Sequence, residues 1–366
     1  MALRFGIEEE YFVIDPGSRE VVPRATDVVR RAAETLGERA STELVTFLAE
    51  AKTPPCDDLD KLREQIRAMR AAMASAAAAE GVRLAATGTP VLGDLVPAPI
   101  CAGPRYAESL ATYRALDDEQ CICSCHVHVE MPDRARAVQV SNHLRPWLPT
   151  LLALAANSPY WAGRDTGHAC WRVMTWARWP VAGPPPYFES LGHYEELVGT
   201  LLGCGALMDT GTIFWDVRPS ARLPTIEVRL ADVALTTDEA ALFASLIRAL
   251  VQVSLTAVEA GETAPNPSPE LLRAAYWLAA RNGLSGDGID TSTGRPVPFP
   301  ALTAELLAHV LPALRDSGDL DRTAGGVRDL LAGGTGADRQ RAVYRRRGRL
   351  TDVVDSAVLA GLPARG

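Results

Sequence analysis

The chain has 366 residues, of which 47% are hydrophobic and 22% charged, so it can bury a large core and is neither disordered nor fibrous. The 37 basic and 45 acidic residues give a formal charge of −8, which argues against non-specific binding of nucleic acid through phosphate neutralisation. Lys52 and Lys61 are the only lysines, so the composition predicts that any bound phosphate is held by arginine, backbone amides or metal.

The N-terminal sequence has no apolar targeting segment, and no uninterrupted apolar run approaches the roughly 18 residues of a membrane span. Seven cysteines, an odd number, do not indicate a secreted disulfide framework. We therefore expect a cytoplasmic protein that does not bind membranes. Because no internal repeat or clear linker divides the chain, we predict a single domain over residues 1–366.

The first third of the chain alternates signals for strand and helix. A strand is predicted over residues 3–14, a helix over 26–36, and a short strand over 82–86 before a loop rich in glycine and proline that extends to Pro104. Residues 57–80 predict a long helix, because apolar side chains recur at helical spacing between an expected N-cap at Asp57 and Gly81.

The rest of the chain is predominantly helical, with two further strands. Strands are predicted over 121–131 and 225–230, and Thr236 with Glu239 predicts a capping box at the start of a long amphipathic helix. Further helical patterns cover 135–157 with proline interruptions, 189–202, 236–261, 268–283, and short segments separated by glycine over the last sixty residues, with a proline-rich loop at 179–186.

Three of the predicted strands each place ionisable side chains on one face, because successive side chains of a strand point to opposite sides. Glu8 and Glu10 share a face of the first strand, while Glu9 interrupts its apolar face. A single sheet could bring the three polar faces together. In the second strand these residues are Ser124, His126, His128 and Glu130, and in the third they are Thr225, Glu227 and Arg229.

Two interpretations of the paired glutamates stay open from the residues alone. Carboxylates two positions apart repel each other, and they are tolerated either at a solvated surface or around a cation. Carboxylates combined with imidazole suit Mg²⁺ or Mn²⁺ better than a soft metal. Zinc bound by the nearby cysteines is disfavoured, because alternation directs Cys121, Cys123 and Cys125 away from the histidines and into the core.

Several ordered motifs resemble the YbdK-type carboxylate–amine ligases, also called the glutamate–cysteine ligase type 2 family, over nearly the whole chain. The motifs are Gly6-Ile-Glu-Glu-Glu10, His126-Val-His128-Val, Asn157-Ser-Pro-Tyr-Trp161, Gly163-Arg-Asp-Thr-Gly167, Trp215-Asp-Val-Arg-Pro-Ser220 and Thr225-Ile-Glu-Val-Arg229. The resemblance implies an α+β fold similar to the catalytic domain of glutamine synthetase. In that fold an antiparallel sheet packs helices on one face and holds an ATP–metal site on the other.

The resemblance also implies roles for individual residues. Glu8, His126 and Glu227 would bind one Mg²⁺ or Mn²⁺, and Glu10 and Glu50 would bind another. Arg229 and Glu50 would be catalytic, with Arg229 stabilising the transferring phosphoryl group. His128 would lie beside the phosphates of ATP, Arg218 and Arg222 would clamp them, and Arg172 would bind the substrate carboxylate.

The implied reaction joins a small-molecule carboxylate, such as glutamate or a related amino acid, to an amine through an acyl phosphate. A homodimer is the expectation from the family. A phosphotransferase of the same fold and a non-catalytic nucleotide- or metal-binding protein are the alternatives. Ser124 and Glu130 stand where the family usually has glycine, and Glu130 would repel ATP, recruit the amine or turn outward. These departures leave both the acid and the amine unidentified.

Overall fold

One antiparallel sheet organises the computed structural model, which describes residues 3–93 and 96–360. Within the described residues it has seven strands, in the order β10, β11, β5, β1, β3 and β2, with β4 paired to the end of β1. Their bounds are β1 Phe5–Ile14, β2 Ala40–Thr42, β3 Leu48–Lys52, β4 Arg83–Ala85, β5 Ser124–Glu130, β10 Val217–Pro219 and β11 Thr225–Asp232. The three predicted strands with polar faces are therefore neighbours: β11, β5 and β1.

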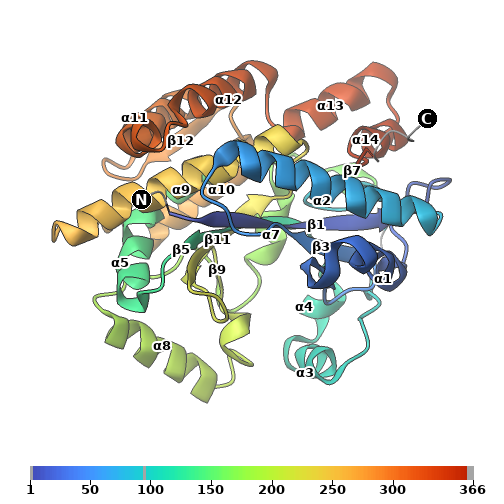
Figure 1. The fold of residues 1–366 in the computed structure, drawn as a ribbon, viewed down its shortest axis with the longest axis horizontal. Helices are drawn as coiled ribbons and strands as arrows, with labels where there is room; N and C mark the ends of the chain where they lie inside the picture. The colour runs from blue at the N-terminus through green and yellow to red at the C-terminus, as the bar shows by residue number, and fades with distance from the viewer. Residues whose placement is uncertain (1–2, 94–95, 361–366) are drawn as a thin grey trace.

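Helices cover one face of this sheet closely. Figure 1 shows the sheet nearly edge-on, with α2 and α9 on one side and α3, α4 and α8 standing farther out on the other. This arrangement confirms the predicted α+β fold. The helices are α1 Ala25–Leu36, α2 Leu59–Ala79, α3 Pro104–Tyr113, α4 Ala115–Asp118, α5 Arg134–Leu144, α6 Leu148–Leu154, α7 Trp171–Trp176, α8 Leu191–Gly203, α9 Thr237–Glu259, α10 Pro269–Asn282, α11 Phe299–Ser317, α12 Leu320–Gly333, α13 Gly336–Arg347 and α14 Leu350–Ser356.

Helix α2 forms where the apolar spacing predicts it. Leu62 and Ile66 are fully buried, and Gly81 has a positive φ of 73°, which favours glycine just beyond the end of the helix. The predicted N-cap was wrong by one residue. The N-cap is Asp58, which has extended backbone geometry and accepts a hydrogen bond from the Lys61 amide at 2.7 Å.

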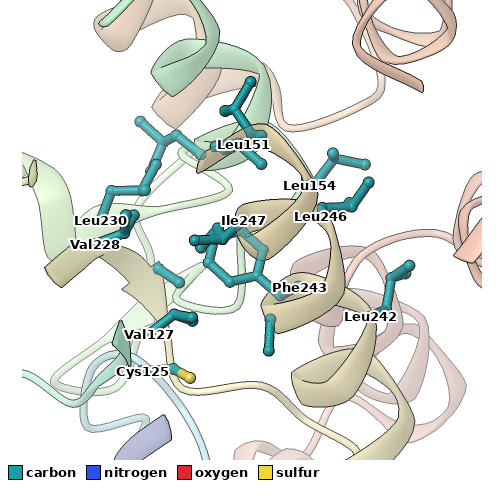
Figure 2. Close-up of a cluster of buried hydrophobic side chains, with 14 of the residues drawn as sticks. Cys125, Val127, Leu151, Leu154, Val228, Leu230, Leu242, Phe243, Leu246 and Ile247 are labelled. Carbon is teal, nitrogen blue, oxygen red and sulfur yellow. The ribbon is translucent and has the colours of Figure 1, made fainter. Parts of the chain in front are cut away.

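Helix α9 is the central helix of the core. Its predicted capping box is present, with Thr236 and Glu239 each bonded to the other's backbone amide. Val127 of β5 and Val228 of β11 face Phe243 and Ile247 of this helix (Figure 2). By length and a mean hydropathy of 1.8 the helix would pass as a membrane span, but 67% of that apolar segment is buried by other parts of the chain. Core packing accounts for its apolar character.

The apolar face of β1 contains one charged residue, Glu9, and the structure supplies a partner for it. Arg70 of α2 donates to both carboxylate oxygens of Glu9, and the Tyr11 hydroxyl donates to one of them at 2.8 Å. Cys123 and Cys125 are buried in the apolar core, as alternation predicts. Among the described residues, the groups of side chains able to hold a metal contain no cysteine.

Short elements complete the molecule. The pairs β6 Tyr160–Trp161 with β7 Arg164–Asp165, β8 Ala182–Gly183 with β9 Phe214–Trp215, and β12 Asp287–Asp290 with β13 Arg295–Pro298 form three small sheets. The sequence patterns missed these, and they missed α3, α4, β2, β3 and β10 as well. Where it lies within the described residues, the predicted loop before Pro104 has no regular element, and residues 94–95 lie outside them. A single domain over 1–366 stays a prediction.

Candidate active site

The polar side chains of the central strands meet on the sheet face opposite α2 and α9. Antiparallel pairing sets Glu8 of β1 beside both His126 of β5 and Lys52 of β3. In the same sheet Glu10 of β1 pairs with Glu50 of β3, and Glu227 of β11 pairs with His128 of β5. The predicted convergence of three polar strand faces is confirmed, and β3 adds a fourth.

Glu8 lies at the centre of this face. Its carboxylate is 3.4 Å from Nδ1 of His126 and 3.6 Å from Nε2 of His128. Burial alone would raise the pKa of Glu8, but the two imidazoles hold it well below its usual range, so the group is a carboxylate. Burial and the charge of Arg229 lower the pKa of His126 to about 4, which leaves that imidazole neutral and able to bind a metal.

Two arginines flank Glu227. Arg218 donates to it from Nε at 2.9 Å and from a terminal nitrogen at 3.3 Å, and gives its remaining bonds to the carbonyls of Gly211 and Ile213. Arg229 contacts the same carboxylate and lies 3.4 Å from Nδ1 of His126. Despite burial, these charges hold the pKa of Glu227 far below its usual value. Nε of Arg229 is buried without a hydrogen-bond partner.

A second group of carboxylates lies toward the other end of the face. Glu10 accepts hydrogen bonds from the amide and hydroxyl of Ser124, at 2.6 and 2.7 Å, and the same hydroxyl lies 2.7 Å from Nε2 of His126. Burial raises the pKa of Glu10, and burial together with Glu50 and Glu10 raises the pKa of Glu43 well above its usual range. Carboxyl groups crowded in this way are typical of a cation site.

Sequence reasoning missed Glu43 and Lys52. Glu43 lies in the loop between β2 and β3, where no periodicity marks it. Lys52 shares a strand face with Glu50 two residues earlier, a signal that the sequence did contain. Its ammonium lies 2.9 Å from Glu50 and 3.3 Å from Glu8. Although burial opposes the shift, Glu50 and Glu8 raise the pKa of Lys52. Lysine therefore contributes to the polar face, while the prediction that phosphate is held by arginine, backbone amides or metal stays a prediction.

Three sets of side chains among the described residues can each hold a metal ion, with ligand atoms within 4.8 Å of one another. This grouping differs from the predicted one. His126 joins Glu8 and Glu50, whereas His128 takes the predicted place of His126 beside Glu8 and Glu227. The third set adds Glu43 to the predicted pair of Glu10 and Glu50.

Two cavities open at opposite ends of the polar face. The larger, about 240 Å³, lies at the Glu8 end, and apolar groups such as Pro55 and Leu223 line it together with Lys52, His128 and Glu130. The smaller, about 80 Å³, lies at the Glu10 end. Its lining includes Glu43, Arg172, Trp176, Phe214 and Arg229.

The remaining predicted residues take different positions. Arg172 is buried, donates at 2.7 Å to Asp232 and also donates to the Leu230 carbonyl, so its guanidinium is held by the protein. Arg222 is exposed on the loop between β10 and β11, which borders the larger cavity through Leu223. Phosphate binding by Arg218 and Arg222 and substrate binding by Arg172 stay predictions.

The sheet with its carboxylate–histidine–arginine face is the arrangement that the sequence motifs predict for the carboxylate–amine ligases, and the family of the chain establishes that class. Residues 4–356 match the model of glutamate–cysteine ligase family 2, and the chain belongs to that family. A protein assigned as glutamate–cysteine ligase 2-1 in Saccharopolyspora erythraea is 42% identical over 99% of this chain and 95% of its own length. A protein assigned as glutamate–cysteine ligase 2-2 in Mycolicibacterium vanbaalenii is 43% identical over 98% of this chain and 97% of its own length.

Solved structures support the fold. A glutamate–cysteine ligase from Francisella tularensis, crystallised with AMP, superposes with a TM-score of 0.72 at 12% identity, over 98% of this chain and 88% of that one. A bifunctional glutathione synthetase from Pasteurella multocida also gives a TM-score of 0.72, at 14% identity, over 97% of this chain and 52% of that one. The fold expected from the sequence motifs is thus confirmed.

Proposed function

We propose that the protein uses ATP and Mg²⁺ to join the carboxylate of glutamate, or of a related amino acid, to an amine through an acyl phosphate. The observation that carries this proposal is the adjacency of Glu8, His128 and Glu227 on three neighbouring strands, with Arg229 against Glu227. Such a set of hard ligands beside a guanidinium suits phosphoryl transfer, which depends on charge neutralisation and positioning.

The donor sets fit divalent cations. Nε2 of His128 is buried without a hydrogen-bond partner, 3.6 Å from Glu8, so it is available to a ligand. Glu8, His128 and Glu227 would hold one ion, and Glu10, Glu43 and Glu50 a second. Bound magnesium would neutralise the triphosphate and orient its γ-phosphoryl group for in-line attack.

The two cavities suggest where the substrates lie. The cavity at the Glu8 end has apolar groups for a nucleobase and Lys52 for phosphates, beside the metal ion that His128 would hold. The cavity at the Glu10 end combines acidic groups with Arg229 and the aromatic rings of Trp176 and Phe214, which suits an amino acid. The phosphoryl group would then pass between the cavities, across the carboxylates.

The arginines divide into two roles in this proposal. Arg229 faces the reacting groups, and its unpartnered Nε can bind the phosphoryl oxygens as charge builds on them. Arg218 and Arg172 are occupied by Glu227 and Asp232, so they hold the site in shape. Arg222 remains the candidate for a direct phosphate clamp. A homodimer and a cytoplasmic location remain predictions.

The test is incubation of the protein with ATP, Mg²⁺, glutamate and a pooled panel of amines, followed by mass spectrometry. We expect ADP and a new amide in equal amounts. ADP with a phosphorylated product and no amide would favour the phosphotransferase. The absence of ADP with every pairing of acid and amine would overturn the enzymatic proposal.

A further inference from the structure

Lys52 lies between the two groups of carboxylates to which the proposed function assigns metal ions, and it contacts one ligand of each. Its ammonium contacts Glu50 at 2.9 Å and Glu8 at 3.3 Å, two of the three residues in the set that also includes His126. The side chain is 37% exposed, so it enters the carboxylate group from the solvent side. The only other lysine of the chain, Lys61, is exposed on α2.

The charges around Lys52 explain why it takes this position. Glu8, Glu10, Glu43 and Glu50 lie close together on the polar face, in overlapping sets of possible metal ligands. Among the described residues, Lys52 is the only lysine or arginine that forms an ion pair with Glu8 or Glu50. The same carboxylates attract an ammonium and a divalent cation, and the two cations repel each other when both lie beside these carboxylates. Metal ions that take Glu8 and Glu50 as ligands would therefore displace Lys52.

The displaced Lys52 side chain can turn toward the larger cavity. Lys52 lines the cavity of about 240 Å³ together with His128 and the backbone around Gly6. This is the cavity in which the proposed function places the nucleotide. A flexible four-carbon stem lets the ammonium turn from the carboxylates toward phosphate oxygens without a change of backbone.

We propose that Lys52 is a tethered cation that holds the Glu8–Glu50 pair before metal binds, and then moves to the nucleotide's phosphates. This inference rests on the proposed function. It predicts that metal and nucleotide assist each other, because the phosphates give Lys52 a new partner when the metal takes its place. Coupling of this kind is reciprocal for the two ligands.

The experiment compares the wild type with Lys52→Met, using Lys61→Met as the matched control. Mn²⁺ alone is titrated and free Mn²⁺ is followed by electron paramagnetic resonance. Binding of a non-hydrolysable methylene analogue of ATP is measured separately by calorimetry at saturating Mg²⁺. We expect Lys52→Met to bind Mn²⁺ about tenfold more tightly, equivalent to 1.4 kcal/mol, and the analogue about tenfold more weakly.

Control variants keep the test decisive. Lys61→Met should match the wild type in both titrations, and Lys52→Arg, which keeps the charge, should bind Mn²⁺ like the wild type. Lys52→Gln replaces Lys52→Met if the latter does not fold. Unchanged or weaker Mn²⁺ binding by the folded variant, while the wild type binds both ligands, would overturn the inference alone. Failure of the wild type to bind either ligand would overturn the proposed function with it.

Discussion

Three consecutive glutamates of β1 have opposite surroundings on the two faces of the sheet. Glu9, on the helical face, is fully buried, and Arg70 and Tyr11 satisfy its carboxylate. Glu8 and Glu10, on the open face, lie among other carboxylates and share histidines, Ser124 and Lys52. Strand alternation alone separates the two environments.

The charged residues of the two faces thus have different roles: those on the helical face stabilise the fold, and those on the open face form a binding site. On the helical face each charge has a dedicated partner, as a buried ion pair requires. On the open face negative charge exceeds the positive charge that the protein supplies, which is costly unless a cation is bound. Excess charge that the fold maintains in this way indicates a binding site. Substitutions on the helical face should therefore mainly reduce stability, whereas substitutions on the open face should mainly reduce metal binding and activity.

The largest effect is expected from Glu8→Gln. We predict a loss of at least about 10³-fold in kcat, because metal-held charge stabilisation is worth several kcal/mol. The variant should still fold, although its melting temperature without metal should fall, because Glu8 pairs with Lys52 and the two histidines. Steady-state kinetics and thermal denaturation measure the two effects. The matched control is Glu34→Gln, because the Glu34 side chain lies on α1 and is 65% exposed. An active Glu8→Gln enzyme would contradict the metal assignment.

The substitution Arg70→Met should lower stability by disrupting the ion pair on the helical face. It leaves Glu9 buried without its partner, and we expect the free energy of unfolding to fall by about 3–5 kcal/mol. Urea denaturation measures this loss, while kcat per folded molecule should change by less than about twofold, since Arg70 is absent from the site. The double variant Glu9→Gln with Arg70→Met should recover part of the stability. A selective loss of activity at full stability would show that the two faces are not independent.

Glu43→Gln sharpens the comparison within the open face. Glu43 forms no ion pair with the lysines or arginines of the described residues, and burial with Glu50 and Glu10 raises its pKa, so its loss should leave metal-free stability unchanged or raise it. Its carboxylate completes the set with Glu10 and Glu50, and we expect Mn²⁺ to bind there about 10- to 100-fold more weakly. Mn²⁺ titration with analysis of stoichiometry measures this. Full retention of every Mn²⁺ site would remove Glu43 from the ligands.

The smallest effect is expected from Glu130→Gln. Glu130 is partly exposed and lines the larger cavity, and among the described residues its carboxylate accepts one long hydrogen bond, 3.4 Å from the Arg4 amide. We expect the KM for ATP to change by less than about threefold, because an exposed charge is screened by solvent. A change of more than about tenfold would assign Glu130 to nucleotide recognition. The departure from the family's glycine would then have a function.

The sequence was most informative where alternation and ordered motifs coincide. Glu8, His126, Glu227 and Arg229 could be placed on one face because each lies in a strand with a clear period of two. Glu43 lies in a loop, and its approach to Glu50 depends on how that loop turns between β2 and β3. The partner of Glu9 was also hidden, because Arg70 looks like one more polar residue of an amphipathic helix until α2 packs on the sheet.

In the proposed reaction the open face transfers the γ-phosphoryl group of ATP to a carboxylate. The most direct measurement uses glutamate, or the acid identified in the amine panel, labelled with ¹⁸O in its reacting carboxyl group, together with ATP, Mg²⁺ and the accepted amine. We predict that one ¹⁸O atom appears in inorganic phosphate for each amide formed, because the acyl phosphate passes its bridging oxygen to phosphate. Amide formation with no ¹⁸O in phosphate would contradict an acyl phosphate intermediate.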